Sequence, residues 1–390
     1  MTGANRWLLP ARLAWRQLRH EPARLAAALS GVLFACLLIF MQLGFMDALF
    51  DSAVKAQAGM RADLYIMNTQ TEALWRTQPF PRARLMQALG AEGVERVSAF
   101  YVGNAAWKNP ETTLKRTLLV FGIDPVSGLL AYDGLDEAAL EAIRRRDVIL
   151  FDERGKPTFG PVPALLREGR LWGELNNRRV EVAGLFRLGP TFGSEGHAIV
   201  SDTTFLTLFP NRSRDQVDVG AIFLAPGADA AAVKARIAPL IGPDVMLLTH
   251  PELVAFEKRY WSETAPIGFI FGLGVVIGLV VGCVIVYQIL FSDIARHIGE
   301  YATLKAMGYP NLYLARVVMG AAAILAVAGY VPGWLASKAL YALATAKIFI
   351  PLTLDLEKSV LVFCLVFGMC VVSGLLAIRK LRDANPADMF

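Results

Sequence analysis

Four long apolar runs without Asp, Glu, Lys or Arg constrain this chain more than any other feature. They lie at 25–46, 264–292, 317–337 and 359–378. Each is close to or above the roughly 20 residues that an α-helix needs to cross the hydrocarbon core of a bilayer. The chain is 55% hydrophobic, above the roughly 45–50% of ordinary soluble proteins. We therefore expect a membrane protein with four transmembrane helices, the first of them an uncleaved anchor rather than a signal peptide.

The basic residues predict how these spans are oriented. They cluster before the first run, between the second and third, and after the fourth: Arg6, Arg12, Arg16, Arg19, Arg24; Arg296, Lys305, Arg316; Arg379, Lys380, Arg382. The positive-inside rule makes that side cytoplasmic. Both termini are then inside, in an inner membrane that the chain crosses several times. Residues 1–24 are expected to form a cytoplasmic amphipathic helix, 338–358 a short periplasmic loop and 379–390 a cytoplasmic tail.

The long stretch 47–263 is predicted to be a periplasmic α+β domain. Strands are expected at 63–67, 97–103, 117–123, 148–151, 179–186, 198–201, 219–224 and 245–248, and helices at 82–89, 135–145, 228–240 and 251–261. A strand–helix–strand pattern occurs at each end of the domain. Together they predict a ferredoxin-like lobe at about 60–105 and 215–250, with an inserted β-rich lobe at about 106–214.

Catalytic and nucleotide-binding motifs are absent from the sequence. It contains no P-loop, and its cysteines and histidines have no spacing typical of a metal site. The four cysteines all lie in apolar runs, where they are expected to act as small buried hydrophobic residues. His197 is expected in a surface loop. The net charge of +5 follows from the basic flanks of the spans and does not indicate nucleic acid. We expect a non-catalytic chain without cofactor or metal.

The segment 293–316, between the second and third runs, is predicted to be a compact helical element. Its apolar residues Ile294, Ile298, Tyr301 and Leu304 recur at helical spacing, while Arg296, Glu300 and Lys305 fall largely on other faces. Gly308 stands where a helix would end, and Pro310 prevents its continuation. A solvated connector would not need such a stripe, whereas a helix that docks in a groove of a cytoplasmic partner would.

The second run carries a row of glycines, Gly274, Gly278 and Gly282, spaced four residues apart. Small residues at this spacing let helices approach closely in lipid. Two alternatives remain open. The row packs against another helix of the same chain, or it forms the interface of a dimer.

Residues 300–308, with the sequence EYATLKAMG, resemble the signature loop of permease subunits of the FtsX/MacB class of ABC transporters. Further stretches resemble the DevC-type permeases of DevBCA exporters: 41–51, 151–161, 188–197, 260–272 and 385–390. The resemblance extends over nearly the whole chain. It implies a MacB-like type VII architecture, with one span, a large extracytoplasmic domain and then three spans.

The resemblance also implies partners and a mechanism. The permease is expected to form a homodimer that binds two copies of a separate ATP-binding subunit, which holds the ATP and Mg²⁺. The coupling residues would be Ile294, Arg296, Ile298, Glu300, Tyr301, Leu304, Lys305 and Gly308. A periplasmic membrane-fusion protein and a TolC-like outer-membrane protein would complete an exporter. Mechanotransmission would drive efflux of a lipid-like or amphiphilic substrate taken from the membrane lipid, such as a glycolipid.

Other functions are compatible with the same layout. An FtsX-like signalling subunit would control an external cell-wall hydrolase, and a lipoprotein-releasing permease would share the fold. The size of the outer domain favours an exporter over a signalling subunit. A membrane enzyme is the weakest alternative, because no catalytic constellation is present.

Overall fold

The structure is a computed structural model that describes residues 22–263, 266–300, 303, 307–348 and 352–382. Its backbone contacts divide the chain into two units. We call Met1–Ala48 with Ile267–Phe390 the helical unit, and Leu49–Pro266 the α+β unit. The predicted amphipathic helix at 1–24 lies almost wholly outside the described residues.

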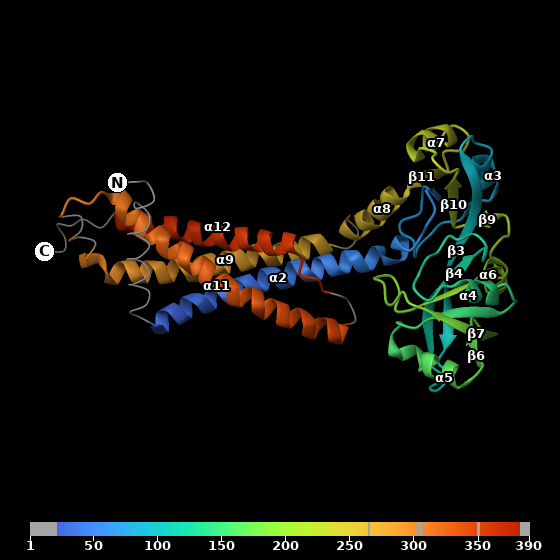
Figure 1. Ribbon diagram of the computed structural model, residues 1–390, viewed down its shortest axis with the longest axis horizontal. Helices are drawn as coiled ribbons and strands as arrows, with labels where there is room; N and C mark the ends of the chain where they lie inside the picture. Colours follow the sequence, from blue (N-terminus) through green and yellow to red (C-terminus); the bar gives the residue numbers. More distant parts are fainter. Residues whose placement is uncertain (1–21, 264–265, 301–302, 304–306, 349–351, 383–390) are drawn as a thin grey trace. The chain divides into compact units, whose positions relative to one another are not determined.

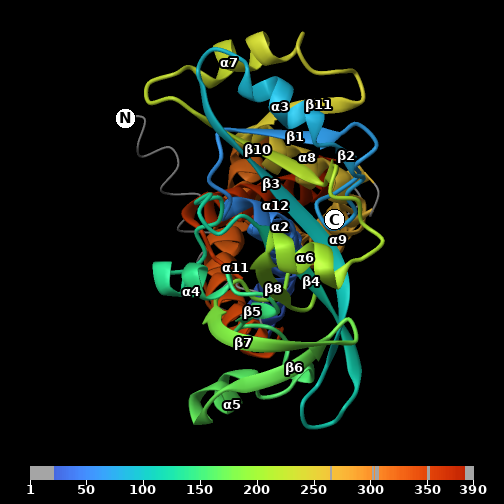
Figure 2. The same ribbon diagram turned by 90° about the vertical axis from the view of Figure 1, so that its right-hand side faces the viewer.

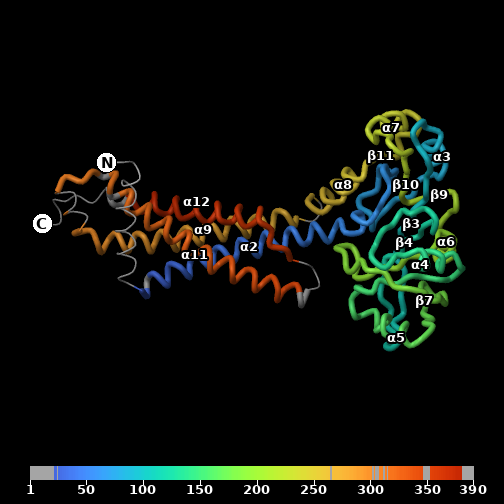
Figure 3. Tube along the Cα trace, viewed as in Figure 1, coloured from blue at the N-terminus to red at the C-terminus, as the bar shows by residue number. Residues whose placement is uncertain are grey.

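The helical unit consists of four long helices that run side by side (Figures 1 and 3). They are α2 (Pro22–Ala58, up to Ala48 in this unit), α9 (Ile267–Arg296), α11 (Asn311–Ile348) and α12 (Leu356–Arg382). Each contains a segment long and apolar enough to cross a membrane: Leu25–Ala58, Ile267–Arg296, Ala315–Thr345 and Leu356–Arg379. The expectation of four apolar helices is confirmed.

These helices share one apolar core, to which Val32, Ile39, Val286, Leu325 and Val366 all contribute. Helix α12 packs against both α9 and α11. Polar contacts near the α11–α12 connection add to this packing. The Lys358 ammonium lies 2.9 Å from the Asp47 carboxylate, and the Tyr330 hydroxyl donates to the Ser359 carbonyl at 2.7 Å.

Two helices continue furthest beyond the uncharged runs. Helix α2 extends past residue 46 to Ala58, and α11 extends past residue 337 to Ile348. The predicted loop at 338–358 is correspondingly shorter. Asp47 and Lys338 end the uncharged runs, but a charged residue does not end a helix whose later turns lie outside hydrocarbon. At 1.5 Å per residue, the 37 residues of α2 exceed the roughly 30 Å hydrocarbon core.

One half of the α+β unit has the split βαβ topology of a ferredoxin-like fold. Strands β1 (Leu64–Asn68) and β3 (Val94–Lys108) flank β10 (Val219–Leu224), and β11 (Val245–Thr249) is the edge strand. All neighbouring pairs among them are antiparallel. Helix α3 (Ala83–Leu89) connects β1 to β3, and helix α7 (Ala230–Ile237) connects β10 to β11 (Figure 2). The two helices bury Leu85, Val233 and Ile237 in the core.

The inserted residues extend the same sheet rather than forming a separate one. The strands are β4 (Lys115–Ile123), β8 (His197–Ser201), β5 (Val148–Asp152), β7 (Arg178–Phe186) and β6 (Leu171–Leu175), in that spatial order after β3. Strand β3 pairs with β10 up to Phe100 and with β4 from Phe100 onward. Its end, at Trp107 and Lys108, also pairs with β6. The sheet therefore curls back on β3.

Short elements complete the α+β unit. They are β2 (Phe80–Pro81), which pairs with β9 (Gln216–Val217), the helices α4 (Glu137–Ala142), α5 (Val162–Glu168) and α6 (Asp202–Leu208), and a 3₁₀ turn at Pro157–Phe159. Helix α8 (His250–Glu263) follows β11 directly. It buries Leu253, Glu257 and Trp261.

Candidate functional site

The segment between α9 and α11 has the local geometry of a short helix with a defined end. Residues 298–300 are helical. The Thr303 hydroxyl donates to the Gly299 carbonyl at 2.9 Å, and the Met307 N–H donates to the Thr303 carbonyl at 3.0 Å. Both bonds span four residues, as in an α-helix. Gly308 has a φ of +88°, the left-handed conformation that commonly follows the last helical residue.

The predicted coupling residues have different environments. Ile294 belongs to α9, is 4% exposed and packs in the core of the helical unit. Because its side chain is buried in this core, Ile294 is not available to contact a partner. The predicted apolar stripe is therefore shorter by this residue. Ile298 is half-buried, and Arg296 and Glu300 are exposed. Tyr301, Leu304 and Lys305 lie outside the described residues. The role of these residues in contacting an ATPase stays a prediction.

Three exposed apolar residues at the end of this segment were not predicted from the sequence. Met307 is 63% exposed, and Tyr309 and Leu312 are also exposed. Tyr309 lies close to Tyr313, with ring centroids 4.8 Å apart. The helical spacing used for the prediction ended at Leu304, so it could not include residues beyond the terminating glycine. Their exposure is the signal that identifies them.

The glycine row of α9 packs within the chain. A Cβ on Gly278 would lie 3.5 Å from side-chain atoms of Leu38 and Ile39 of α2. A Cβ on Gly282 would lie 2.7 Å from the Ala35 Cβ and would clash with Met369 of α12, and one on Gly274 would clash with Gln42 of α2. These contacts support the first alternative, packing inside one chain. They occupy the face that a dimer interface through the same row would need.

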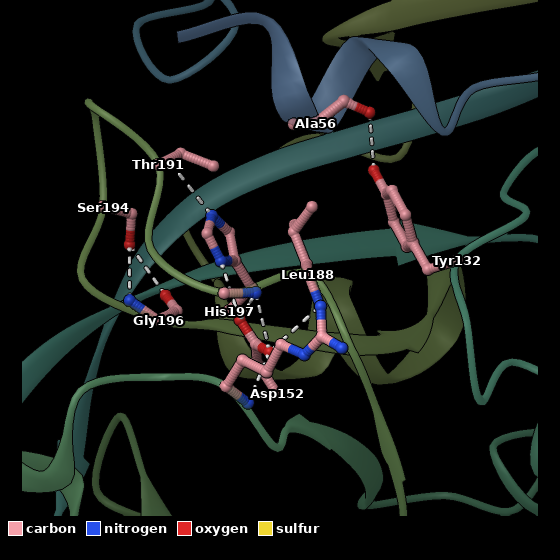
Figure 4. Close-up of polar contacts among 10 residues, drawn as sticks. Ala56, Tyr132, Asp152, Leu188, Thr191, Ser194, Gly196 and His197 are labelled. Carbon is pink, nitrogen blue, oxygen red and sulfur yellow. Dashed lines mark hydrogen bonds and ion pairs between the residues drawn. The ribbon is translucent and has the colours of Figure 1, made fainter. Parts of the chain in front are cut away.

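A second group of contacts anchors the end of α2 within the α+β unit (Figure 4). The Tyr132 hydroxyl donates to the Ala56 carbonyl at 2.7 Å, and the Ala131 N–H donates to the Gly59 carbonyl at 2.9 Å. The ring of His250, at the start of α8, lies 3.0 Å from the Gln57 carbonyl. The end of α2 and the start of α8 are thus joined to each other and to the body of this unit.

Asp152 and His197 hold the loop 188–196 beside this anchor (Figure 4). The Asp152 carboxylate accepts the N–H groups of Leu188 at 3.1 Å and Gly189 at 2.8 Å, and it lies 3.3 Å from His197 Nδ1. Because Asp152 is the acceptor, Nδ1 carries the proton, and Nε2 is left to accept from the Thr191 hydroxyl at 3.3 Å.

The expectation that His197 lies in a surface loop is wrong. His197 is the first residue of β8, and its side chain is fully buried. Burial lowers the pKa of His197 below its usual value, although the Asp152 carboxylate acts in the opposite direction. The imidazole is therefore neutral, and its contact with Asp152 is a hydrogen bond rather than an ion pair.

The order Thr191, His197, Asp152 matches that of a hydrolase triad in residue types. The imidazole and the carboxylate are both completely buried, so no substrate can approach the hydroxyl–imidazole pair from the imidazole side. Backbone N–H groups already occupy the Asp152 oxygens. This group of residues therefore fastens a loop and gives no support to a catalytic role.

Aromatic side chains connect α8 to the same loop. The ring of Trp261 stacks on Trp75 at 6.2 Å between centroids and meets Phe192 edge-on at 4.1 Å. A side chain on Gly193 would lie 2.8 Å from the Trp75 ring. Trp261 thus connects α8 to the segment before β2 and to the loop that Asp152 fastens.

A cavity of about 390 Å³ lies at the far end of β3 and β4, and its lining includes Asn109, Arg116 and Pro161. The buried side-chain amide of Asn109, in this lining, already has hydrogen-bond partners. Asn109 Oδ1 accepts the N–H groups of Glu111 and Thr112, and Nδ2 donates to the Thr158 carbonyl. The buried amide is therefore not free to bind a ligand.

Comparison with known proteins gives a family match for the C-terminal part of the chain. Residues 265–386 match the family model described as FtsX-like permease C-terminal. No curated protein matches the chain.

Three solved structures are similar to about half of the chain. The periplasmic region of MacB from Actinobacillus actinomycetemcomitans is 13% identical, with a TM-score of 0.36, and the match covers 50% of this chain and 92% of that one. The extracellular domain of the noncanonic ABC-type transporter YknZ from Gram-positive bacteria is 14% identical, with a TM-score of 0.35 and coverage of 48% and 99%. A domain of a putative permease protein from Porphyromonas gingivalis is 12% identical, with a TM-score of 0.29 and coverage of 48% and 88%. Scores below 0.5 do not establish a shared fold. The part of the chain that contains α9, α11 and α12 is therefore similar to the FtsX-like permease C-terminal family.

Proposed function

We propose that this chain is the non-catalytic permease subunit of an ATP-driven exporter of the FtsX/MacB class, closest to the DevC type. A separate ATP-binding subunit, with ATP and Mg²⁺, docks on the segment between α9 and α11. The chain works as a homodimer, with both termini and this segment in the cytoplasm and the α+β unit in the periplasm. The observation that carries the proposal is the glycine-terminated helical segment with exposed Met307, inside the region that matches the permease family.

In this proposal ATPase motion passes through the helical unit to the α+β unit. The anchors of α2 and α8 in that unit support such a transfer, because they fix both helices to the sheet and its loops. A membrane-fusion protein docks on the α+β unit and leads to a TolC-like outer-membrane duct. The substrate is lipid-like or amphiphilic, such as a glycolipid, and enters from the membrane lipid.

The coupling role is tested by Met307→Asp in the full-length chain co-purified with its ATP-binding partner. A charge on this exposed residue is expected to remove the permease-dependent stimulation of ATP hydrolysis while leaving the chain inserted and folded. Leu356→Asp is the matched control, since Leu356 is 81% exposed and begins α12 rather than following the coupling segment. Unchanged stimulation with Met307→Asp, or an equal loss with both variants, contradicts the proposal.

The proteins that co-purify with the native chain test which class of system it serves. An exporter predicts a membrane-fusion protein. Recovery of a cell-wall hydrolase instead would indicate the signalling alternative, and recovery of a lipoprotein on the α+β unit would indicate lipoprotein release.

A further inference from the structure

Glu257, in the middle of α8, is a buried carboxyl group at the meeting point of three segments. Its side chain is 2% exposed. Oε2 accepts the N–H of Leu74 at 2.9 Å, and Oε1 accepts the indole N–H of Trp261 at 3.1 Å. The side-chain amide of Gln57, on α2, is a third hydrogen-bond partner. One carboxyl group therefore joins α8, the end of α2 and the segment before β2.

All three partners of Glu257 are neutral donors. A buried carboxylate is normally compensated by a cation, and without one it tends to lose its charge. The charged and titratable side chains on the surrounding elements are either engaged elsewhere or exposed. Lys55 of α2 lies beside Gly189. Other groups have partners of their own: Glu72 with Arg76, Lys156 with Glu195, His197 with Asp152, His250 with the Gln57 carbonyl and Glu252 with Lys234. The remaining ones are exposed: Asp51, Lys258, Arg259 and Glu263. Burial accordingly raises the pKa of Glu257 to about 7.

The side chain of Gln57 gives an independent reason to expect that the Glu257 carboxyl group is protonated. Its side chain is 1% exposed, and its Oε1 has no hydrogen-bond partner among the described residues. An ionised carboxylate can only accept hydrogen bonds, so it cannot satisfy this oxygen. A protonated carboxyl group carries an O–H donor. Turning the Gln57 amide over would let that donor reach Oε1, because the oxygen and nitrogen of an amide exchange places on such a turn.

We propose that Glu257 is a proton-binding site whose occupancy sets how firmly α8 is fastened to the end of α2 and to the segment before β2. The proton comes from solvent and is bound at the carboxyl group, where it removes a buried charge and gives Gln57 Oε1 a donor. Acidification through neutrality tightens this junction, and alkalinisation weakens it. The contacts all lie within the α+β unit, so the inference does not depend on the proposed transport function.

The direction of the effect on stability follows from the two pKa values. The pKa of Glu257 is about 7 when folded, above its ordinary value of 4.5. Between these values the folded chain binds a proton that the unfolded chain releases. The contribution of Glu257 to stability is therefore fully present below the ordinary pKa and is lost as the pH rises through about 7.

Infrared difference spectroscopy of the full-length chain in lipid nanodiscs tests the proposal directly. The wild-type chain should gain the C=O band of a protonated carboxyl group as the pH falls, with a midpoint about 7. Glu257→Gln should lack this component. Glu263→Gln, an exposed glutamate of the same helix, should retain it. A wild-type chain without a carboxyl group that titrates near neutrality overturns the proposal, as does a component that persists in Glu257→Gln.

A conservative second variant keeps the test decisive if Glu257→Gln does not fold. Trp261→Phe preserves an aromatic side chain but removes the indole N–H that donates to the carboxyl group. Hydrogen bonds to an ionised acceptor are roughly twice as strong as neutral ones, so this loss weakens the ionised form more than the protonated form. The midpoint of the infrared band should rise. A midpoint that stays in place or falls contradicts the assignment of the band to Glu257.

Discussion

Individual residues show where sequence patterns lose information. The stripe through Ile294 was inferred from spacing alone, and spacing cannot show that this residue belongs to the apolar core that the four helices share. His197 follows a run of glycine and polar residues, which favours a loop. Its side chain is nevertheless buried, where it forms a hydrogen bond with Asp152. No local signal reports a hydrogen bond across 45 residues. A Cβ on any of the three glycines of α9 would meet a side chain of α2 or α12, and small residues at a four-residue spacing are typical of such close helix packing.

The neutral, buried imidazole of His197 predicts a pH-dependent loss of stability in the acid range. Its pKa lies below the ordinary value of 6.5 in the folded chain. Below that ordinary value the unfolded chain binds a proton that the folded chain does not, so this contribution to stability falls as the pH decreases through 6.5. His197→Asn retains an N–H donor for Asp152 but cannot titrate.

The unfolding midpoint of the full-length chain, measured at a series of pH values, checks this prediction. The wild-type midpoint should fall on acidification relative to that of His197→Asn. A constant difference between the two chains across this range would mean that His197 is not buried in the neutral form. Glu257 acts in the opposite direction, and comparison of two chains that both contain Glu257 cancels its contribution.

At the level of elements, most strands lie near their predicted positions, and several short elements were missed. Strands β1, β4, β7 and β10 lie close to their predicted positions. Strand β6 and helices α5 and α6 were not predicted. Each has only five to seven residues, and each is determined by its contacts within the sheet more than by its own composition. Gly308 and Pro310, after the segment between α9 and α11, carry explicit backbone restrictions that a sequence shows directly. The ends of α2 and α11 carry no such signal and lie beyond the uncharged runs.

The close packing of α9 predicts that Gly282→Val destabilises the helical unit. The new Cβ would meet Ala35 and Met369, and overpacking of this kind costs about 1–3 kcal/mol. Gly272→Val on the same helix is the control, because a Cβ there meets nothing within 4 Å. Thermal unfolding of the detergent-solubilised chain should show a lower midpoint for Gly282→Val alone. Equal midpoints for the two variants would contradict the packing of this row inside the chain.

At the scale of the whole molecule, the order of the apolar helices and the α+β unit followed from hydropathy, while the continuity of the sheet did not. The ferredoxin-like strand order was predicted from two strand–helix–strand patterns, one at each end of the domain. Strand β3, however, changes partner from β10 to β4 at Phe100, in the middle of an uninterrupted strand. Nothing in the local sequence marks this change. The partners outside the chain came from the family resemblance, and they stay predictions.

The central claim is that an ATP-binding subunit sits on the segment that ends at Gly308. Site-directed cross-linking in native membranes tests it most directly, with Met307→Cys in a chain whose four native cysteines are replaced by alanine, and Leu356→Cys as the matched control. A thiol-reactive photo-cross-linker on position 307 should capture an ATP-binding protein, and the same reagent on position 356 should not. Absence of that product from position 307, or equal capture from both positions, would contradict the account.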